Sequence, residues 1–314
     1  MTIKKITIVG SGPMANAYHD VLAELRVDHL IVGNTGSRRM LFSQVTDDNF
    51  IRGGIPVAVD QKVLTDWAIV AVPIPSLALV VRQLVQAGVK NILVEKPGAL
   101  DHEELSKLKE YVEENNANVR VAYNRRFLSS VAALKNRLVS DGGATSMSFE
   151  FTEWGHVVKN LNHPREVMET WLIANSSHVI DLAFFLCGEP LELNCSTLGG
   201  LPWHTKSSRF SGSGVTIEGC VFSYLADWSS AGRWAIDVRT SRASYSLKPL
   251  EHLYCCKVGS LESVQLKIDD AIDAKFKPGL HRMVTNFLSG DHADLPELGS
   301  QLNRWKIYEK IAGY

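Results

Sequence analysis

The sequence lacks a large net charge, a long apolar run and a hydrophobic leader. Its 314 residues carry a formal net charge of −1, which sets up no field for nucleic acid or an anionic membrane surface. No apolar stretch approaches the ~18 residues of a membrane span, and residues 1–9 hold no signal-like apolar core. We therefore predict a soluble, cytoplasmic protein that binds neither nucleic acid nor membranes.

The sequence also has few cysteines, and they follow no pattern. The five are odd in number and none has the spacing of a metal site. Cys255 and Cys256 are adjacent, so in a strand they would face opposite sides of the sheet. We predict five reduced thiols and no bound metal.

Two patterns of hydrophobicity divide the chain into two predicted domains. Residues 1–123 alternate short apolar strands with helical stretches, which is typical of a parallel sheet in an α/β fold. The predicted strands there are Lys4–Val9, His29–Gly33, Trp67–Val72, Asn91–Glu95 and Val119–Tyr123. The predicted helices are Pro13–Leu25, one beginning over Ser37–Gln44, Ser76–Ala87 and one capped by Asp101.

Residues 124–314 read differently. A helix is predicted over Phe127–Ser140, and a very apolar helix over Trp171–Cys187. Alternating polar and apolar residues predict strands in Thr145–Trp154, Val215–Leu225, Trp234–Thr240 and Ala243–Leu247. Two more helices are predicted over Leu280–Ser289 and Leu298–Ile311. This second domain is therefore predicted to be α+β, with a large, mainly antiparallel open sheet.

A glycine-rich turn directly follows the first predicted strand. It has the form GxGxxA and opens a helix, which is the arrangement that binds a dinucleotide. The first glycine allows the tight turn, the second allows a pyrophosphate to approach, and the alanine allows close packing. The alternative is a glycine turn in an unrelated α/β protein. The predicted cofactor contacts are Gly10, Ser11, Gly12, Pro13, Met14 and Ala15.

The end of the second predicted strand lacks an acidic residue. An NAD site usually places Asp or Glu there to bind the ribose, and this strand ends in Asn34. Hydroxyl and guanidinium groups would instead hold a 2′-phosphate, so we expect NADP(H) in preference to NAD(H). The alternative is that the arginines are solvated residues of the next helix. The residues concerned are Asn34, Thr35, Ser37, Arg38 and Arg39.

Two charges end the buried strand Asn91–Glu95. Glu95 and Lys96 precede Pro97, and charges at the mouth of a buried strand need partners. Ligands of open α/β sheets bind at the carboxyl ends of the strands, so Lys96 is predicted beside the nicotinamide. A structural Glu–Lys pair is the alternative. The predicted cofactor contacts at these strand ends are Glu95 and Lys96, together with Val72 and Pro73 at the end of another strand.

A polar stripe lies on the apolar helix of the second domain. Asn175, His178 and Asp181 are three residues apart and share one face. Because the rest of the helix is apolar, it should be buried, and its polar stripe must be satisfied by protein or ligand. A histidine in such a setting is more often structural than catalytic, but three aligned polar groups favour a site.

These motifs together resemble the glucose–fructose oxidoreductase / inositol dehydrogenase / MocA family. The resemblance is carried by Gly10–Ala15, Glu95–Pro97, Ala122–Phe127, Asn175–Gly188 and Phe276–Gly279, and it covers essentially the whole chain. It implies a Rossmann domain (1–123), an α+β substrate-binding and oligomerisation domain (124–314), and a homodimer or homotetramer formed through the second sheet. It also implies pyridine-nucleotide chemistry on a sugar or polyol, with Lys96 and His178 catalytic.

The chain departs from the family pattern in two places. Many relatives carry an Asp four residues before the catalytic histidine, where this chain has Ala174, with Asn175 as the nearest polar group. Relatives often have Pro-Asn followed by His where this chain has Pro73-Ile74. An amide cannot ionise, so acid–base work would rest on His178 and Lys96.

Further candidates lie at the same edge and in the second domain. We expect Asn124 and one of Arg125 and Arg126, preferentially Arg126, to bind substrate together with Asn175 and Asp181. Structural roles are favoured for the remaining aromatic and polar candidates. These are Trp154, His156, Asn160, His163, Trp171, Trp203, Trp228, Trp234 and His281.

The sequence therefore predicts an NAD(P)-dependent oxidoreductase that transfers hydride to or from a secondary hydroxyl or ketone. Its substrate is predicted to be a sugar, nucleotide sugar or polyol. Two alternatives stay open: imine or enone reduction or glycoside cleavage on the same scaffold, and a non-catalytic cofactor-binding sensor or assembly protein.

Overall fold

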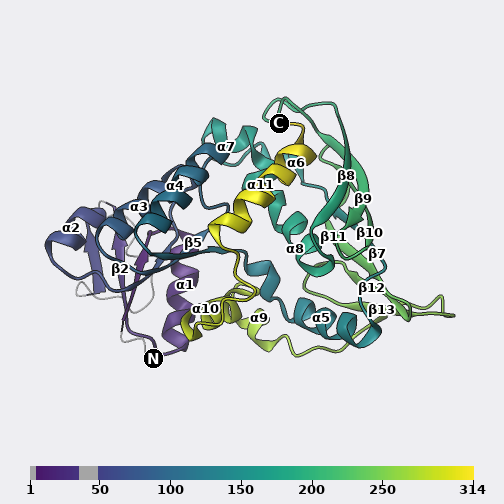
Figure 1. Cartoon of the computed structure of the whole chain (residues 1–314), viewed down its shortest axis with the longest axis horizontal. Helices are drawn as coiled ribbons and strands as arrows, with labels where there is room; N and C mark the ends of the chain where they lie inside the picture. The colour runs from purple at the N-terminus through teal and green to yellow at the C-terminus, as the bar shows by residue number, and fades with distance from the viewer. Residues whose placement is uncertain (1–4, 35–48) are drawn as a thin grey trace. The chain divides into compact units, whose positions relative to one another are not determined.

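The computed structural model describes residues 5–34 and 49–314 and divides the chain into two compact units (Figure 1). The first unit contains residues 1–123 and 275–303, and the second contains residues 124–274 and 304–314. The chain thus leaves the first unit after Tyr123 but returns to it at Lys275, whereas the sequence predicted that all residues after 123 form the second domain. Each unit is described by itself below.

The first unit is built on a six-stranded parallel sheet in the order β3-β2-β1-β4-β5-β6. In its centre Ile8 of β1 lies opposite Ile31 of β2 and Ile69 of β4, and all three side chains are fully buried. The order reverses at β1, which is the switch point where doubly wound sheets bind their ligands. The strands are β1 (Ile6–Val9), β2 (His29–Gly33), β3 (Phe50–Arg52), β4 (Trp67–Val70), β5 (Asn91–Glu95) and β6 (Asn118–Ala122).

Helices connect these strands. They are α1 (Pro13–Glu24), α2 (Gly54–Asp60), the short η3 (Ile74–Ser76), α3 (Leu77–Gln86) and α4 (His102–Glu114). The predicted N-cap of α4 is confirmed, since the Asp101 carboxylate accepts from the Glu104 backbone N–H at 2.8 Å. The helix expected over Ser37–Gln44 lies outside the described residues.

Residues 275–303 join this unit because their side chains complete its core. Helix α10 (Leu280–Ser289) packs against α1, and Phe287 meets Trp67 of β4 edge to face with ring centroids 5.1 Å apart. At the sheet edge, the Val121 backbone N–H donates to the Pro296 carbonyl at 2.9 Å. Arg120 pairs with Glu297 at 2.8 Å. The amphipathic pattern of α10 would suit a helix of either unit. The contacts above show that it belongs to the first unit.

The second unit is built on an eight-stranded sheet in the order β14-β13-β12-β11-β7-β10-β9-β8. Its pairs are antiparallel except β10 with β7, so the predicted large, mostly antiparallel sheet is confirmed. The strands are β7 (Ser146–Phe151), β8 (Pro190–Leu198), β9 (Arg209–Thr216), β10 (Val221–Asp227), β11 (Trp234–Arg239), β12 (Ala243–Leu247), β13 (Tyr254–Lys257) and β14 (Val264–Gln265).

One predicted strand is wrong. The segment Val215–Leu225 contains the end of β9, a turn and most of β10, which pair with each other as a hairpin. Gly219 in the turn has φ of 81°, a left-handed conformation that glycine adopts without strain. Gly219 is the only turn-favouring residue in this otherwise strand-like segment, which is why the pattern looked like one strand.

Helices of the second unit cover one face of this sheet. Helix α8 (Ser177–Cys187) contacts β7 and β11, and Phe184 meets Phe149 and Phe222 edge to face. The π-helical turn Leu172–Ser176 leads directly into α8, so the predicted helix Trp171–Cys187 is one continuous helical run. The other helical segments are η4 (Asn124–Phe127), α5 (Ser129–Asp141), α6 (Gly155–Val158), α7 (Arg165–Glu169), α9 (Ala271–Lys275) and α11 (Leu298–Ala312), of which α11 begins in the first unit.

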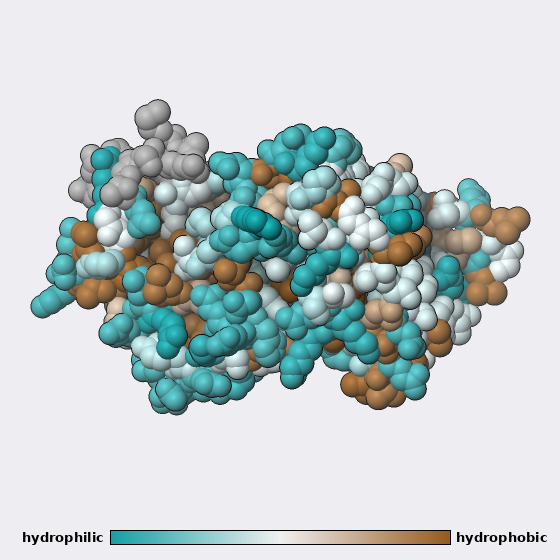
Figure 2. All heavy atoms as spheres, turned by 90° about the horizontal axis from the view of Figure 1, so that it is seen from above, coloured by the Kyte–Doolittle hydropathy of each residue, from teal (hydrophilic) through white to brown (hydrophobic). Residues whose placement is uncertain are grey.

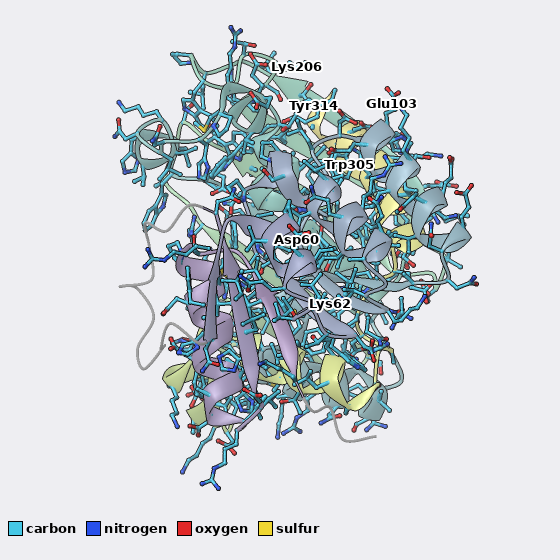
Figure 3. All side chains as sticks on the ribbon, turned by 90° about the vertical axis from the view of Figure 1, so that its left-hand side faces the viewer. Asp60, Lys62, Glu103, Lys206, Trp305 and Tyr314 are labelled. Carbon is cyan, nitrogen blue, oxygen red and sulfur yellow. The ribbon has the colours of Figure 1, made fainter. Side chains whose placement is uncertain are left out.

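The chain end is anchored in the second unit. The Tyr314 hydroxyl is hydrogen-bonded to Nε2 of His204 at 2.5 Å, and the ammonium of Lys206 lies 4.9 Å from the centre of the Tyr314 ring. The side chains of Lys206 and Tyr314, both labelled in Figure 3, lie close together. His204 in turn packs on Trp228, so the last residues close an aromatic cluster beside the sheet.

The far side of the second sheet exposes apolar side chains. Val221 and Leu225 of β10 are 59% and 63% exposed, and they alternate with buried residues. Figure 2 shows hydrophobic residues, in brown, among polar ones at the end where this sheet lies. The other exposed apolar residues of its strands and turns are Leu191, Leu198, Ile217, Val258, Leu261 and Val264. Among the described helices, none is long and apolar enough to cross a membrane.

Candidate functional site

The glycine turn after β1 has room for only a glycine at its first position. Gly10 has φ of 134°, and a Cβ built there would lie 2.2 Å from the Ala71 carbonyl oxygen that follows β4. The Gly10 backbone N–H donates to the Val32 carbonyl of β2 at 2.9 Å. The turn is therefore held against both neighbours of β1, at the point where the strand order reverses.

The second glycine faces open space. A Cβ built on Gly12 would meet nothing within 4 Å, and Gly12 is the N-cap of α1, so no side chain caps the first N–H groups of the helix. Pro13 occupies the first turn, which contains no acidic residue. An uncapped helix start beside an open glycine fits the pyrophosphate of a dinucleotide. Ser11 and Met14 are half-buried in the same turn, and Ala15 is fully buried against the sheet.

Two neighbouring strand ends complete this edge. Asn34 directly after β2 is exposed. After β4, Val72 is half-buried and Pro73 is exposed. The predicted contacts Thr35, Ser37, Arg38 and Arg39 lie outside the described residues, so the ribose side is represented here by Asn34 alone.

The partner of Glu95 is a tyrosine of α1. The Tyr18 hydroxyl donates to Glu95 Oε1 at 2.7 Å. Burial raises the pKa of Glu95 above its usual range, against the opposing effects of this hydrogen bond and of the charges of Lys96 and Lys277. Burial and the Glu95 carboxylate also raise the pKa of Tyr18, so the phenol stays a donor. Lys277 belongs to the Phe276–Gly279 motif, which this contact brings to the β5 end.

Lys96 is half-exposed directly after β5. The following turn is fixed from α11, where Gln301 Nε2 donates to the Pro97 carbonyl at 3.0 Å and is 3.1 Å from the Tyr123 hydroxyl. The first unit thus presents a lysine at the carboxyl edge of its sheet, on a turn held by a fully buried side chain.

In the second unit, two residues of the predicted stripe reach the surface. Within the stretch 171–184, Asn175 and His178 are the only residues that are not buried. Asn175 is in the π-helical turn and His178 in the first turn of α8. π-Helical turns are rare and frequent at functional sites. The amide of Asn175 and the imidazole of His178 are therefore the accessible groups on a helical run that is otherwise buried.

The third residue of the stripe is committed to the interior. Asp181 is 1% exposed and accepts from Arg126 through both oxygens, at 2.7 and 2.6 Å. Arg304 of α11 donates to the Asp181 Oδ1 at 2.9 Å and its backbone carbonyl at 2.8 Å, and also to Glu189 at 2.7 Å. The sequence predicts that Asp181 and Arg126 bind substrate. This geometry does not support that role, because each side chain is paired with a buried partner.

A buried carboxylate that the sequence reading did not single out lies next to Asn175. Glu153 follows β7 and is 1% exposed. Its Oε1 accepts from Asn175 Nδ2 at 2.9 Å, Ser176 Oγ at 2.7 Å and Trp234 Nε1 at 3.3 Å. Burial raises the pKa of Glu153, although these hydrogen bonds and the charge of Arg233 oppose it.

Trp234 connects this carboxylate to the histidine. Its ring centroid is 5.9 Å from that of His178, and the guanidinium groups of Arg125 and Arg233 lie 5.9 and 4.9 Å from its centre. Arg125 also pairs with Glu251 at 2.6 Å. Of the two adjacent arginines it is therefore Arg125, not Arg126, that borders the accessible polar pair. Asn124 is 5% exposed.

The other aromatic candidates are mostly structural. Trp171, Trp228 and Trp234 are buried, and Trp203 stacks on Trp228 with their planes 7° apart. Trp154 is the exception, because it is 47% exposed and carries the Arg233 guanidinium 5.0 Å from its ring centre. His281 is half-exposed at the start of α10, beside Phe276.

Glu153 and Arg233 are thus residues of the candidate site that sequence reasoning missed. Glu153 gave no strand-end signal, because the predicted strand Thr145–Trp154 runs past it, whereas β7 ends at Phe151. Arg233 gave no signal either, because it lies in a polar turn before β11 and only its stacking on two tryptophans distinguishes it.

Comparison with known proteins agrees with this geometry. Residues 4–123 match the model of a family described as oxidoreductases with an NAD-binding Rossmann fold. This is the family that the motifs resemble, so the predicted resemblance is confirmed. The chain matches no curated protein sequence.

Solved structures resemble the whole chain. UDP-N-acetylglucosamine 3-dehydrogenase from Acidithiobacillus ferrooxidans has a TM-score of 0.72 at 15% identity and covers 100% of this chain and 98% of its own. A levoglucosan dehydrogenase in complex with NADH and L-sorbose has a TM-score of 0.77 at 17% identity, covering 100% and 96%. An NAD-binding oxidoreductase from Klebsiella pneumoniae has 0.76 at 14%, covering 99% and 96%. At these identities the likeness shows the fold.

Proposed function

Because residues 4–123 belong to the NAD-binding Rossmann family of oxidoreductases, we propose that this chain is an NAD(P)-dependent enzyme acting on a secondary hydroxyl or its ketone in a sugar, nucleotide sugar or polyol. The observation that carries the proposal is the accessible pair Asn175 and His178 on an otherwise buried helical run, in a chain with a nucleotide-fitting glycine turn. The two sugar dehydrogenases of similar fold support the substrate class.

The proposed roles follow from the chemistry of the side chains. His178 takes the hydroxyl proton as general base during oxidation and returns it during reduction. The Lys96 ammonium stabilises the negative charge that develops on the alkoxide oxygen, and Asn175 binds a substrate hydroxyl. When bound, the nicotinamide supplies the hydride acceptor or donor. This proposal requires Lys96 and His178, which lie in different units, to act on one substrate.

We propose NADP(H) in preference to NAD(H) as the cofactor. The support is Asn34, an uncharged residue at the exposed end of β2, where a carboxylate would repel a 2′-phosphate. Asn34→Asp should shift preference toward NAD(H), measured as the ratio of kcat/KM for the two cofactors. An unchanged ratio would contradict this role.

We also propose a homodimer or homotetramer formed through the second sheet. Its outer face carries the exposed apolar residues of β8, β10 and the β13–β14 region, and exposed apolar patches often mark interaction surfaces. Sedimentation of Val221→Lys/Leu225→Lys should show a smaller species than the wild type if this face assembles. A wild-type monomer would end this proposal without affecting the catalytic one.

Turnover tests the catalytic proposal directly. A panel of sugars, nucleotide sugars and polyols is incubated with NADP⁺ or NAD⁺, and formation of reduced nicotinamide is followed by its absorbance. Lys96→Ala should reduce kcat by ~10²-fold or more while the thermal unfolding curve stays unchanged. Cofactor binding without turnover on the whole panel would instead support a cofactor-binding sensor. Substrate cleavage without net cofactor reduction would support glycoside cleavage.

A further inference from the structure

The amide of Asn175 has one end fixed and one end free. Its Nδ2 donates to Glu153 Oε1 at 2.9 Å. Among residues 5–34 and 49–314, its Oδ1 makes no hydrogen bond, and it is not among the buried unsatisfied atoms. Asn175 is half-buried while both of its chain neighbours are buried. The free carbonyl oxygen of the amide is therefore on the accessible side, on the same edge as His178.

The orientation of this amide is determined by the atoms around Glu153. Trp234 Nε1 can only donate, and it donates to Oε1 at 3.3 Å. Oε1 is therefore an acceptor whether or not the carboxyl group is protonated, because a proton would reside on Oε2. An acceptor must face the NH₂ end of an amide rather than its oxygen. The oxygen and nitrogen are the two branches of one planar group, so Oδ1 points away from Glu153.

We propose that Glu153 is a positioning residue that makes Asn175 present a hydrogen-bond acceptor to the substrate. An acceptor beside His178 selects a ligand that brings a donor, such as a second hydroxyl next to the one that reacts. Residues three apart on a helix are neighbours at about 5–6 Å between Cβ atoms, which suits two hydroxyls on adjacent carbons. The inference rests on the proposed function, whose substrate contact it specifies.

The surrounding hydrogen bonds hold Glu153 in place against Asn175. Ser176 Oγ and Trp234 Nε1 hold the same oxygen, so Glu153 cannot turn away from Asn175 without breaking two further hydrogen bonds. A glutamine at position 153 would keep its carbonyl oxygen toward the Trp234 Nε1–H and would still face Asn175 with an acceptor. A leucine at position 153 removes the acceptor, so Asn175 could then rotate and show the substrate its NH₂ end.

A charge swap tests the contact without any substrate. Asn175→Asp places two carboxylates about 3 Å apart and should lower the melting temperature at pH 8 by about 5 °C. The double variant Glu153→Leu/Asn175→Asp no longer holds two carboxylates in contact, so its loss of stability should be smaller than the sum of the losses of the two single variants. A double variant no more stable than that sum predicts would overturn the proposed contact.

Kinetics test the consequence for the substrate. The probe is the compound that the wild type oxidises best, or failing turnover binds best by tryptophan fluorescence, among D-glucose, D-galactose, myo-inositol and L-sorbose. Glu153→Leu, which removes the acceptor that orients the amide, should raise KM or Kd about 3- to 10-fold with kcat changed less than about 2-fold. The double variant Glu153→Leu/Asn175→Asp presents a carboxylate oxygen, an acceptor in any orientation, and should regain the wild-type KM.

Ser176→Ala is the matched control, because it removes a hydrogen bond to the same Glu153 oxygen without touching the Asn175 amide. Its KM should stay within about 2-fold of the wild type. The monodeoxy analogue that lacks the hydroxyl bound by Asn175 should bind the wild type more weakly but bind Glu153→Leu with little difference from the parent compound.

The outcomes separate the two proposals. A wild type that turns over the probe, with Glu153→Leu unchanged in KM and in its discrimination against deoxy analogues, would overturn the role of Glu153 and leave the oxidoreductase proposal standing. A wild type without turnover on any compound would count against the oxidoreductase proposal, while the charge swap and the binding measurements would still decide the role of Glu153.

Discussion

The two halves of the polar stripe on one helical run have opposite fates. Asn175 and His178 are half-buried and reach the surface, whereas Asp181, one turn further along, is 1% exposed and held by Arg126 and Arg304. Spacing placed all three on one face. What separates them is the chemistry of neighbouring elements, because two arginines, Arg126 and Arg304, meet Asp181 and hold it in the interior.

This comparison teaches that a buried carboxylate can serve either stability or ligand binding depending on which groups share it. Asp181 is shared between two guanidinium groups, so removing it leaves buried charge. Glu153 is shared between an amide, a hydroxyl and an indole, so removing it frees the Asn175 amide, which we propose contacts the substrate. The predictions that follow test this division.

The largest effect expected is on activity. His178→Ala should lower kcat/KM by ~10²–10⁴-fold, because a general base contributes about that much. Thermal unfolding should stay within about 2 °C of the wild type, since the imidazole lies at the accessible end of the stripe. Both quantities are measured on the same purified sample. A variant that loses stability in proportion to activity would erase the contrast with Asp181.

Asp181→Ala should do the opposite. It leaves Arg126 and Arg304 as uncompensated buried charges, so the free energy of unfolding should fall by about 3–5 kcal/mol. Urea denaturation followed by tryptophan fluorescence measures this change. His178→Ala serves as the control on the same helix, and a wild-type unfolding midpoint for Asp181→Ala would show that the ion pairs are not important to the fold.

The pH dependence of stability should sharpen the role of Glu153. Burial raises its folded-state pKa above the ordinary value of 4.5, so the folded state binds this proton more tightly than the unfolded state does. Its contribution to stability is present below pH 4.5 and is lost as the pH rises through the folded pKa. A tenfold difference in proton affinity corresponds to about 1.4 kcal/mol.

Glu153→Gln removes this titration. The unfolding free energy of the wild type, minus that of Glu153→Gln, should therefore decrease as the pH is raised from 4 through the interval above 4.5. Urea titrations at a series of pH values give the difference. Glu95, whose pKa is also raised, is present in both proteins and cancels. A difference that stays flat would contradict the burial of a titrating group at position 153.

The smallest effect calibrates the others. Asp101→Ala removes the N-cap of α4. This helix belongs to the first unit, whereas the polar stripe belongs to the second. The free energy of unfolding should fall by about 1 kcal/mol, and kcat/KM should stay within about 2-fold. If this variant lost activity strongly, global destabilisation would have to be considered in the interpretation of His178→Ala.

Much of the fold was predictable from local pattern. The strands His29–Gly33, Asn91–Glu95 and Ala243–Leu247 and the helix Leu280–Ser289 agree with the structure in their bounds, because each ends at a strong turn signal. The hairpin in Val215–Leu225 was hard to predict, since Gly219 is the only turn signal within the segment. Strands β8, β13 and β14 were missed because one side of the sheet is exposed and their patterns are mixed.

The candidate site was predictable only in part. Gly10, Gly12 and Lys96 carry backbone or strand-end signals that are legible in a single sequence, and His178 stands out on its apolar helix. The partners of Asp181 come from η4 and α11, over a hundred residues apart in the chain, so no local pattern could reveal that they close this end of the stripe. Glu153 likewise acquires its role from residues of two other elements, the π-helical turn and β11.

The interleaving of the two units along the chain limits where the protein can be divided into fragments. A fragment ending at Tyr123 would contain every strand of the nucleotide-binding sheet but would lack four of its contacts. Phe287 covers Trp67, and Pro296 accepts a hydrogen bond from the edge strand. Glu297 neutralises Arg120, and Gln301 holds the turn after Lys96. The nucleotide-binding half is thus not a portable cassette, and recombination between relatives should succeed only where both of its pieces travel together.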